Sequence, residues 1–295
     1  MGDSLLIVGQ LMAFGLVWGG LYAILAMGLN LIYGVMKILN IAHGELLMLG
    51  GYIAFWLFTL WQISPLASVP LAALVLFALG LVINRLVVEP IVKVSRSIDM
   101  MERATLIAFF GVLLVIQNGA LLIWSGDYRV ISYLTQSVSL LGVSASAGRL
   151  VVFATAMLVA VLMHLFLTRT FLGKAIRAMS QDREVALLMS IDARRVGLIS
   201  FGIGSALAGI AGVLAGLIYV ITPTLGLMFT LKAFTVLVVG GLGSMGGALL
   251  AGLGLGIAES LGSFLLGEGY KKAIDYVVLV IVILLLSYGW GLRRV

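Results

Sequence analysis

Polar side chains inside long apolar segments are the first candidates for chemistry in this sequence. Asn40, His43 and Glu45 lie within one short stretch of an otherwise apolar run. A charge at the centre of a bilayer costs about 2.5–3.5 kcal/mol on insertion scales, so such residues usually face a cavity, pair, or begin a helix. We expect Asn40 to cap a helix whose first turn carries Glu45, where the dipole favours it. A capped helix after a membrane-embedded turn and a site for a polar substrate group both fit the pattern.

A glycine-rich stretch that contains Gly240, Gly241, Gly243 and Ser244 is the second candidate. From Gly241 to Gly246 it matches the G-x-G-x-x-G pattern of dinucleotide-binding folds. We reject that interpretation because the chain lacks alternating strands and helices, and because the flanking residues are apolar enough for lipid. The stretch indicates either irregular backbone beside a transport pathway or close helix packing.

Glu259 is the third candidate, because it lies inside a strongly apolar run. A carboxylate in a membrane segment is a functional candidate by default. The alternative is a structural role, as the buried partner of Lys232 or of another polar group. Glu45 and Glu259 together keep open an ion-coupled secondary transporter, which needs membrane-embedded carboxylates for proton coupling.

The composition indicates the class of protein that positions these residues. Of 295 residues, 62% are hydrophobic and 10% are charged, and the mean hydropathy is +1.22. A soluble domain has about 45–50% apolar and about 25% charged residues, so a soluble enzyme, a disordered chain and a nucleic-acid-binding domain are poor interpretations. The chain has no cysteine, and its two histidines, His43 and His164, are far apart, so we predict neither a metal site nor a catalytic residue.

The apolar runs predict an all-α fold, a polytopic transmembrane helical bundle of about eight membrane segments in a single domain, 1–295. A helix that crosses the hydrocarbon core needs about 20 apolar residues, and runs that are apolar on all sides favour helices over barrel strands. The runs are 5–29, 35–61, 66–88, 104–125, 149–169, 196–222, 232–266 and 272–290. Small-xxx-small pairs such as Gly15/Gly19 and Gly252/Gly256 predict close helix contacts.

Charged linkers predict the orientation of the chain. Linkers 85–103 and 169–195 hold most of the charge between the spans, which places both in the cytoplasm, whereas 126–148 is nearly free of Lys and Arg and suits the outside. Arg293 and Arg294 should also lie inside. They do so if the glycine-rich stretch is a broken or re-entrant segment that returns the chain to the outside.

Within the second cytoplasmic linker, residues 182–191 predict a short amphipathic helix. Val185, Leu188 and Met189 follow the i, i+3, i+4 spacing of one helix face. The helix could lie at the membrane interface, form part of a solvated loop, or dock into a groove on a soluble partner. The sequence has no G-x-x-x-x-G-K-[ST], H-E-x-x-H or G-x-S-x-G motif, so the chain is not expected to be an enzyme or to hydrolyse nucleotide itself.

These residues resemble a known family, the inner-membrane permease subunits of the branched-chain amino acid ABC importers, of LivH/LivM type. Residues 25–34 followed by 40–45 resemble its N-terminal signature, and residues 232–248 resemble its C-terminal one. The resemblance covers nearly the whole chain. It implies translocation of branched-chain or related amino acids across the inner (plasma) membrane, although urea and short amides occur as substrates among relatives.

The resemblance also implies that the cytoplasmic loop 170–195 carries a helix that docks on an ATPase. Permeases of ABC importers have an E-A-A-x-x-x-G helix for this purpose, and here Val185 replaces an Ala and Ser190 replaces the Gly. The docking residues implied are Arg177, Asp182, Glu184, Val185, Ala186, Leu188 and Ser190. The translocation pathway is expected to be bordered by Asn40, His43, Glu45, Gly240, Gly241, Gly243, Ser244 and Glu259.

Partners follow from the same resemblance. It implies a second, homologous permease subunit, two ABC ATPase subunits, a periplasmic solute-binding protein and membrane lipid, and no nucleic acid. ATP-Mg would be used by the ATPases, and no cofactor is expected on this chain. An ion-coupled transporter or a channel would instead work without a nucleotide-hydrolysing partner.

Overall fold

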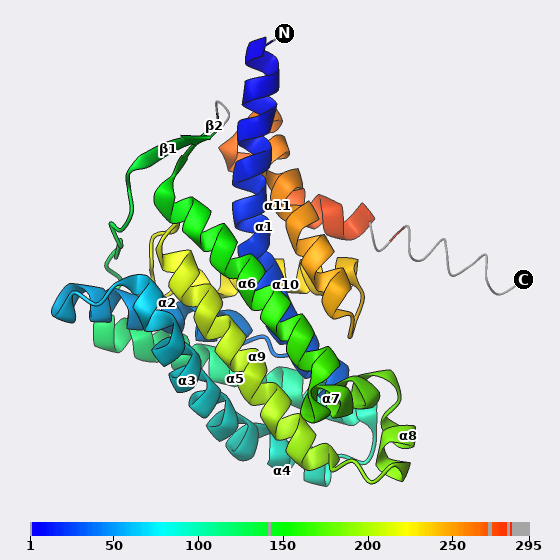
Figure 1. Ribbon diagram of the computed structural model, residues 1–295. Helices are drawn as coiled ribbons and strands as arrows, with labels where there is room; N and C mark the ends of the chain where they lie inside the picture. Colours follow the sequence, from blue (N-terminus) through cyan, green and yellow to red (C-terminus); the bar gives the residue numbers. More distant parts are fainter. Residues whose placement is uncertain (1, 141–142, 271–272, 282–283, 285–295) are drawn as a thin grey trace, which may run out of the picture.

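The computed structural model describes residues 2–140, 143–270, 273–281 and 284 as a bundle of helices with one short β-hairpin (Figure 1). The predicted all-α class is confirmed. The elements are α1 Gly2–Met36, α2 His43–Trp61, α3 Pro65–Ile83, π-helix η1 Asn84–Val88, α4 Glu89–Val94, α5 Ile98–Trp124, β1 Ser137–Leu140, β2 Val143–Ser146, α6 Ala147–Arg169, α7 Phe171–Gln181, α8 Arg183–Leu188, α9 Ala193–Gly216, α10 Leu225–Gly240, α11 Met245–Leu266 and 3-10 helix η2 Glu268–Tyr270. Residues 273–281 form one further helical stretch.

Seven helical segments in the described ranges are long and apolar enough to cross a bilayer. One of them joins α3, η1 and α4 into a continuous segment, Pro65–Val94. Helix α10 has 16 residues, so at a rise of about 1.5 Å per residue it is about 24 Å long, which is shorter than the hydrocarbon core of about 30 Å. Seven spans and the short α10 agree with the prediction of about eight segments.

Two of the predicted segments are interrupted. The run 35–61 was expected to contain a turn before a helix that Asn40 caps. The turn is present, but α1 ends at Met36, Lys37 adopts a left-handed conformation with φ 56°, and α2 starts only at His43. A left-handed residue after the last turn is a common way to end a helix. The run 232–266 divides into α10 and α11 at the glycine-rich turn, which confirms the predicted break. The run 196–222 is helical only as far as Gly216.

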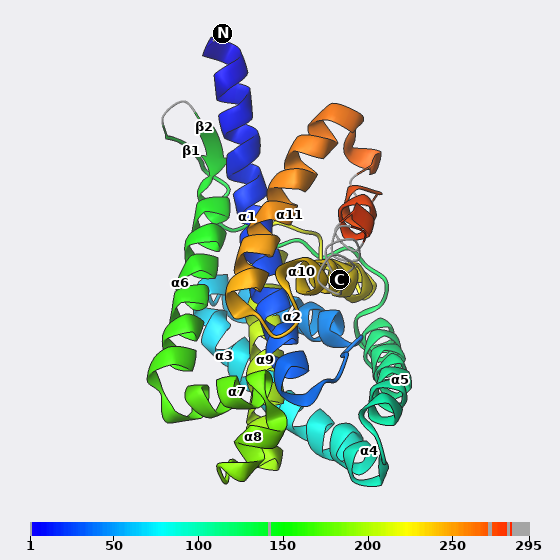
Figure 2. The same cartoon turned by 90° about the vertical axis from the view of Figure 1, so that its right-hand side faces the viewer.

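The two ends of the bundle separate the charged linkers from the β-hairpin. Helices α4 and α8 lie at one end, and the β-hairpin lies at the other end with the N-terminus (Figures 1 and 2). The linkers 85–103 and 169–195 therefore share an end. Helix α11 runs antiparallel to α1 and returns toward the hairpin end, since Ser260 donates a hydrogen bond to the Leu11 carbonyl at 2.7 Å. Arg293 and Arg294 are outside the described residues.

Glycine allows α1 and α11 to pack backbone against backbone. A Cβ at Gly19 would lie 2.6 Å from the Cα of Leu253, and a Cβ at Gly252 would lie 2.7 Å from the Cα of Ala23. Side chains of any size would force the two helices apart. The predicted packing role of Gly15/Gly19 and Gly252/Gly256 is confirmed on these two facing surfaces.

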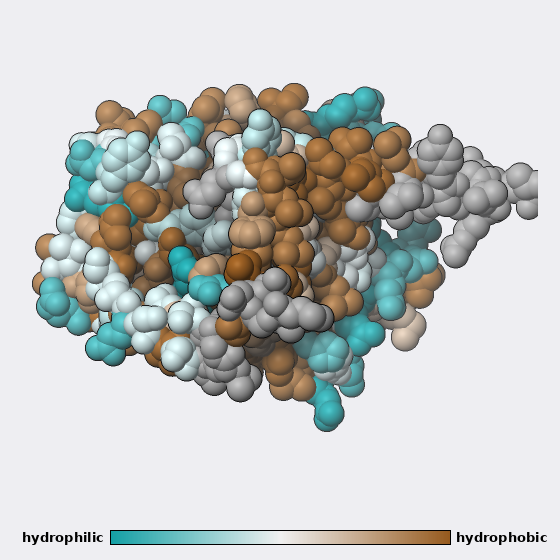
Figure 3. Space-filling model, turned by 90° about the horizontal axis from the view of Figure 1, so that it is seen from above, coloured by the Kyte–Doolittle hydropathy of each residue, from teal (hydrophilic) through white to brown (hydrophobic). Residues whose placement is uncertain are grey.

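Burial separates a central group of helices from a peripheral one. In α9, 72% of the most apolar window is buried, compared with 17% in α5. Figure 3 looks onto the hairpin end and shows apolar surface interrupted by smaller hydrophilic patches. Helices α1, α9 and α11 lie between α6 on one side and α5 on the other (Figure 2), so the candidate residues on α1, α10 and α11 lie among other helices.

Candidate functional site: a polar pathway and a docking helix

The segment between α1 and α2 is held by backbone hydrogen bonds and by the hydroxyl of one threonine of α10. The His43 amide donates to the Asn40 carbonyl at 3.3 Å. The Thr230 hydroxyl accepts from the Gly44 amide at 2.9 Å and lies 3.0 Å from the Ile41 carbonyl, to which it donates. Because Thr230 belongs to α10, the start of α2 and the short helix are held together.

The prediction that Asn40 caps α2 is wrong. The residue at the N-cap position is Ala42, and no side chain caps the helix. The turn from Asn40 to Ala42 bonds through its own carbonyls, so the cap position falls two residues later. The Asn40 side chain is 1% exposed, and its Oδ1 accepts no hydrogen bond within the described part of the chain.

Glu45 and His43 point to different neighbours. The His43 ring is buried, and its Nε2 lies 3.1 Å from the Leu25 carbonyl of α1. The Glu45 carboxyl is fully buried and packs against Gly226 at the start of α10, where a Cβ would lie 2.5 Å from Oε1. Neither oxygen of Glu45 has a hydrogen-bond partner in the described ranges. The three residues therefore do not form one cluster, although all three are buried as expected.

The glycine-rich turn between α10 and α11 is held by Asn30 of α1. Its amide nitrogen donates to the Ser244 carbonyl at 2.8 Å and to the Gly241 carbonyl at 3.2 Å, and its oxygen accepts from the Gly243 amide. Gly241 and Gly243 have φ of 89° and 85°. Residues other than glycine rarely adopt such positive φ angles. The Ser244 hydroxyl caps α11 by accepting from the Gly247 amide at 3.1 Å.

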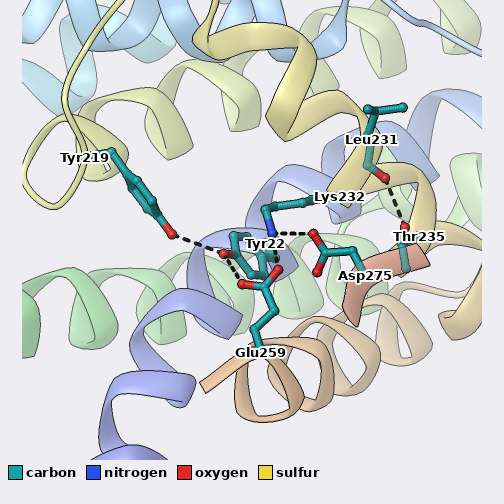
Figure 4. Close-up of polar contacts among 7 residues, drawn as sticks. All are labelled: Tyr22, Tyr219, Leu231, Lys232, Thr235, Glu259 and Asp275. Atoms are coloured by element: carbon teal, nitrogen blue, oxygen red, sulfur yellow. Dashed lines mark hydrogen bonds and ion pairs between the residues drawn. The ribbon is translucent and has the colours of Figure 1, made fainter. Parts of the chain in front are cut away.

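Glu259 forms a buried ionic cluster with Lys232 and Asp275 (Figure 4). The Lys232 ammonium donates to Glu259 and, at 2.6 Å, to Asp275 Oδ2. The Tyr22 hydroxyl donates to Glu259 Oε2 at 2.7 Å and lies 3.1 Å from the Tyr219 hydroxyl. One of the two interpretations of Glu259 was a structural role as the buried partner of Lys232. The structure shows this ion pair.

Helix α1 contacts three parts of this predicted pathway. Tyr22 contacts the ionic cluster, the Leu25 carbonyl contacts His43, and Asn30 holds the glycine-rich turn. The structure therefore places Glu259, His43 and the turn at successive levels of one helix. It does not bring the side chains of Glu45 and Glu259 together in any contact given by the described residues.

The predicted docking residues form a separate group at the opposite end from the hairpin. Asp182 begins α8, and its carboxylate accepts from the amides of Glu184 and Val185 at 2.9 and 3.0 Å. The helix ends at Leu188, which is earlier than the predicted limit at residue 191. Leu188 is 84% exposed and Met189 is 74% exposed, so apolar side chains project from a charged end of the molecule. Such exposed apolar surface usually marks an interaction site.

The surroundings of Ala186 and the backbone of Ser190 account for the residue types that the docking motif has at these two positions. Ala186 is 2% exposed and faces the rest of the protein, which restricts this position to a small side chain. Ser190 has φ 59°, and glycine adopts that left-handed conformation without strain. Of the motif's Ala and Gly positions, 186 is therefore packed and 190 is left-handed, whereas Val185, at the first Ala position, is 54% exposed.

Helix α7 connects this docking segment to the glycine-rich turn. A Cβ at Gly34 would lie 2.7 Å from the Ser180 hydroxyl, and a Cβ at Gly243 would lie 3.0 Å from it. A cavity of about 100 Å³, lined among others by Arg177 and Asn30, lies between α1, α7 and the turn. Arg177 is therefore placed beside the turn rather than on α8 itself.

Several contacting residues were not predicted from the sequence as site residues: Tyr22, Asn30, Ser180, Thr230 and Asp275. Asn30 interrupts an apolar run just as Asn40 does, so the same criterion identifies it. Tyr22, Ser180 and Thr230 are common residue types in membrane helices, and only their contacts mark them. Asp275 is a carboxylate within a predicted span and carried the same signal as Glu259.

The fold and these contacts define a multi-pass membrane protein, with buried polar side chains in its helical core and a short helix at one end that exposes apolar side chains. The comparison with known families is consistent with that class. Residues 11–287 match the family described as branched-chain amino acid transport system / permease component. The chain belongs to this family, and it is a transport permease.

Curated relatives cover almost the full length of the chain. The permease protein BraD of a high-affinity branched-chain amino acid transport system from Pseudomonas aeruginosa is 35% identical, over 95% of this chain and 94% of its own. The LivH permease proteins of Salmonella typhimurium and Escherichia coli K12 are each 32% identical, over 98% of this chain and 97% of theirs. No solved structure matches the chain.

Proposed function

We propose that this chain is the permease subunit of an ATP-binding cassette importer that translocates branched-chain or related amino acids across the inner membrane. The relatives carry permease names from branched-chain amino acid transport systems, which supports the substrate class. The chain itself binds no nucleotide and no cofactor in this proposal. It works with a second related permease, two ATPase subunits that use ATP-Mg, and a periplasmic solute-binding protein.

The contact between α7 and the glycine-rich turn is the observation that carries the proposal. An ATPase seated on the apolar face of α8 would move the segment that begins at Arg177. Ser180 lies against Gly243, and the turn that contains Gly243 joins α10 to α11. A displacement at the docking end would thereby reach the two helices that hold the ionic cluster. Coupling of this kind requires that the ATPase distinguish two arrangements of the permease.

The test removes the docking face while leaving the spans unchanged. The double variant Glu184→Lys with Leu188→Asp places charge on the exposed face of α8. We expect it to lose co-purification with the ATPase and to lose ATP-driven uptake of leucine. The matched control is Asp99→Lys with Val94→Asp, which makes the same chemical changes on the other linker, where Val94 is 69% exposed.

Retention of both ATPase binding and uptake by the α8 variant would overturn the proposal. Uptake of leucine by the purified chain in proteoliposomes, driven by an ion gradient without ATP or partners, would instead select the ion-coupled alternative. Competition of leucine uptake by excess urea or acetamide, but not by valine, would select a urea or short-amide permease.

A further inference from the structure

A cavity of about 230 Å³ lies beside the ionic cluster, between α10 and the helical stretch 273–281. Its apolar wall comes from Leu227, Met228 and Leu231. These residues follow the i, i+1, i+4 positions of one side of α10, so they form a continuous surface along one and a half turns. Met is a flexible side chain that adapts to ligands of different shape.

The charged side of this cavity is formed by Asp275. The residue is 6% exposed, and its Oδ2 accepts from Lys232 at 2.6 Å. Its Oδ1 is buried and accepts no hydrogen bond from any residue in the described ranges. A buried acceptor without a donor is unfavourable, so a ligand that supplies an N–H group to this carboxylate is favoured there.

Charges of both signs lie next to the apolar wall. Lys232 is shared by two carboxylates, Glu259 and Asp275, so with all three groups ionised the cluster has one negative charge more than positive. Two threonines, Thr224 and Thr235, also line the cavity. An ammonium group would restore neutrality.

We propose that this cavity is the station at which the permease holds its substrate, a zwitterionic α-amino acid with a branched apolar side chain. This inference rests on the proposed function and locates its substrate. The ammonium group binds Asp275, and the side chain packs against Leu227, Met228 and Leu231. Asp275 is ion-paired with Lys232 of α10, which is also ion-paired with Glu259 of α11. A substrate bound to Asp275 would therefore affect the two helices that the glycine-rich turn joins.

The test changes the shape of the cavity in the complete, co-expressed transporter reconstituted into vesicles with its ATPase subunits. Leu231→Trp fills the cavity, and we expect leucine uptake to fall about tenfold or more, since steric changes of this size shift discrimination by about 10–200-fold. Leu231→Ala enlarges the cavity, and the ratio of phenylalanine uptake to valine uptake should rise several-fold. Leu250→Trp is the matched control, because Leu250 is 72% exposed on α11 and is not part of the cavity.

A charge variant tests the polar side. Asp275→Asn leaves Glu259 to neutralise Lys232, and we expect leucine uptake to fall about tenfold while ATPase co-purification and ATP hydrolysis by the complex persist. Unchanged uptake and an unchanged phenylalanine-to-valine ratio in these variants, with the ATPase still bound, would overturn the cavity and leave the proposed function intact. A wild-type complex that hydrolyses ATP but takes up no amino acid would overturn both.

Discussion

The contact between Glu45 and Gly226 constrains a single residue through a side chain of another helix. The carboxyl group occupies the space that a side chain at position 226 would need. The identity of residue 226 is therefore set by a residue on another helix, and not by the conformation of its own backbone. A glycine in a helix is otherwise less favourable than alanine by about 1 kcal/mol.

This contact predicts that Gly226→Ala destabilises the protein. The added methyl group displaces Glu45, and overpacking of this kind costs about 1–3 kcal/mol. Thermal unfolding of the detergent-purified protein should show a lower midpoint for Gly226→Ala. Gly254→Ala is the control, because a Cβ at Gly254 meets nothing within 4 Å, and it should leave the midpoint unchanged or raise it.

A double variant tests whether Gly226→Ala destabilises the protein through its contact with Glu45 or through a general effect of the substitution on α10. With Glu45→Ala in the background, Gly226→Ala should cost much less stability, because the two changes share one contact and are not additive. Equal losses with and without Glu45 would show that the carboxyl group is not what position 226 excludes.

Among the elements, the glycine-rich turn connects four helices. It joins α10 to α11, it is held by Asn30 of α1, and it lies against Ser180 of α7. A left-handed conformation costs a residue other than glycine about 1–2 kcal/mol. The turn is therefore a place where a small change of residue type disturbs several helices together.

We predict that Gly243→Ala impairs transport more than assembly. Its φ of 85° disfavours alanine, and a Cβ there would lie 3.0 Å from the Ser180 hydroxyl. Uptake of leucine by the complex should fall several-fold, while the amount of ATPase that co-purifies stays the same. Gly246→Ala, where a Cβ would meet nothing within 4 Å, should behave like the parent. Equal uptake by the two variants would contradict the role of the turn.

Element by element, the sequence was most informative where apolar length alone decides the outcome. Helix class and the shared end of the two charged linkers follow from hydropathy and charge, and the break in 232–266 follows from its glycines. The limits of α2 did not follow, because Lys37 ends α1 in a left-handed conformation that apolar periodicity does not report. The polar residues Asn40 to Glu45 predicted a turn in this run, but not that the helix would start at His43.

The site was predictable only in part, for a related reason. A polar residue in an apolar run can be recognised from sequence, as Glu259 and Asn40 were. Lys232 was named as a partner of Glu259, but Tyr22 and Asp275 were not. Asn30 is 211 residues from Gly241 and 214 residues from Ser244, the two residues whose carbonyls accept from its amide nitrogen. Nothing in the local sequence specifies that pairing. The contacts depend on how α1 crosses α11, which glycine packing determines.

For the whole molecule, the proposed function requires that α8 and the β-hairpin face opposite sides of the membrane. The chain contains no cysteine, so a single introduced cysteine is its only thiol. Ser139 on β1 is exposed, and Met189 after α8 is 74% exposed. Both positions accept a thiol without disturbing a buried contact.

We predict that Ser139→Cys reacts with a membrane-impermeant maleimide in sealed, right-side-out vesicles, whereas Met189→Cys reacts only after the vesicles are permeabilised. The physical reason is the positive-inside distribution of Lys and Arg on the linkers at the α8 end. Labelling of both cysteines from the same side would rule out the bundle as an importer driven from the cytoplasm. Labelling in the reverse order would do the same, because an ATPase in the cytoplasm could not reach α8.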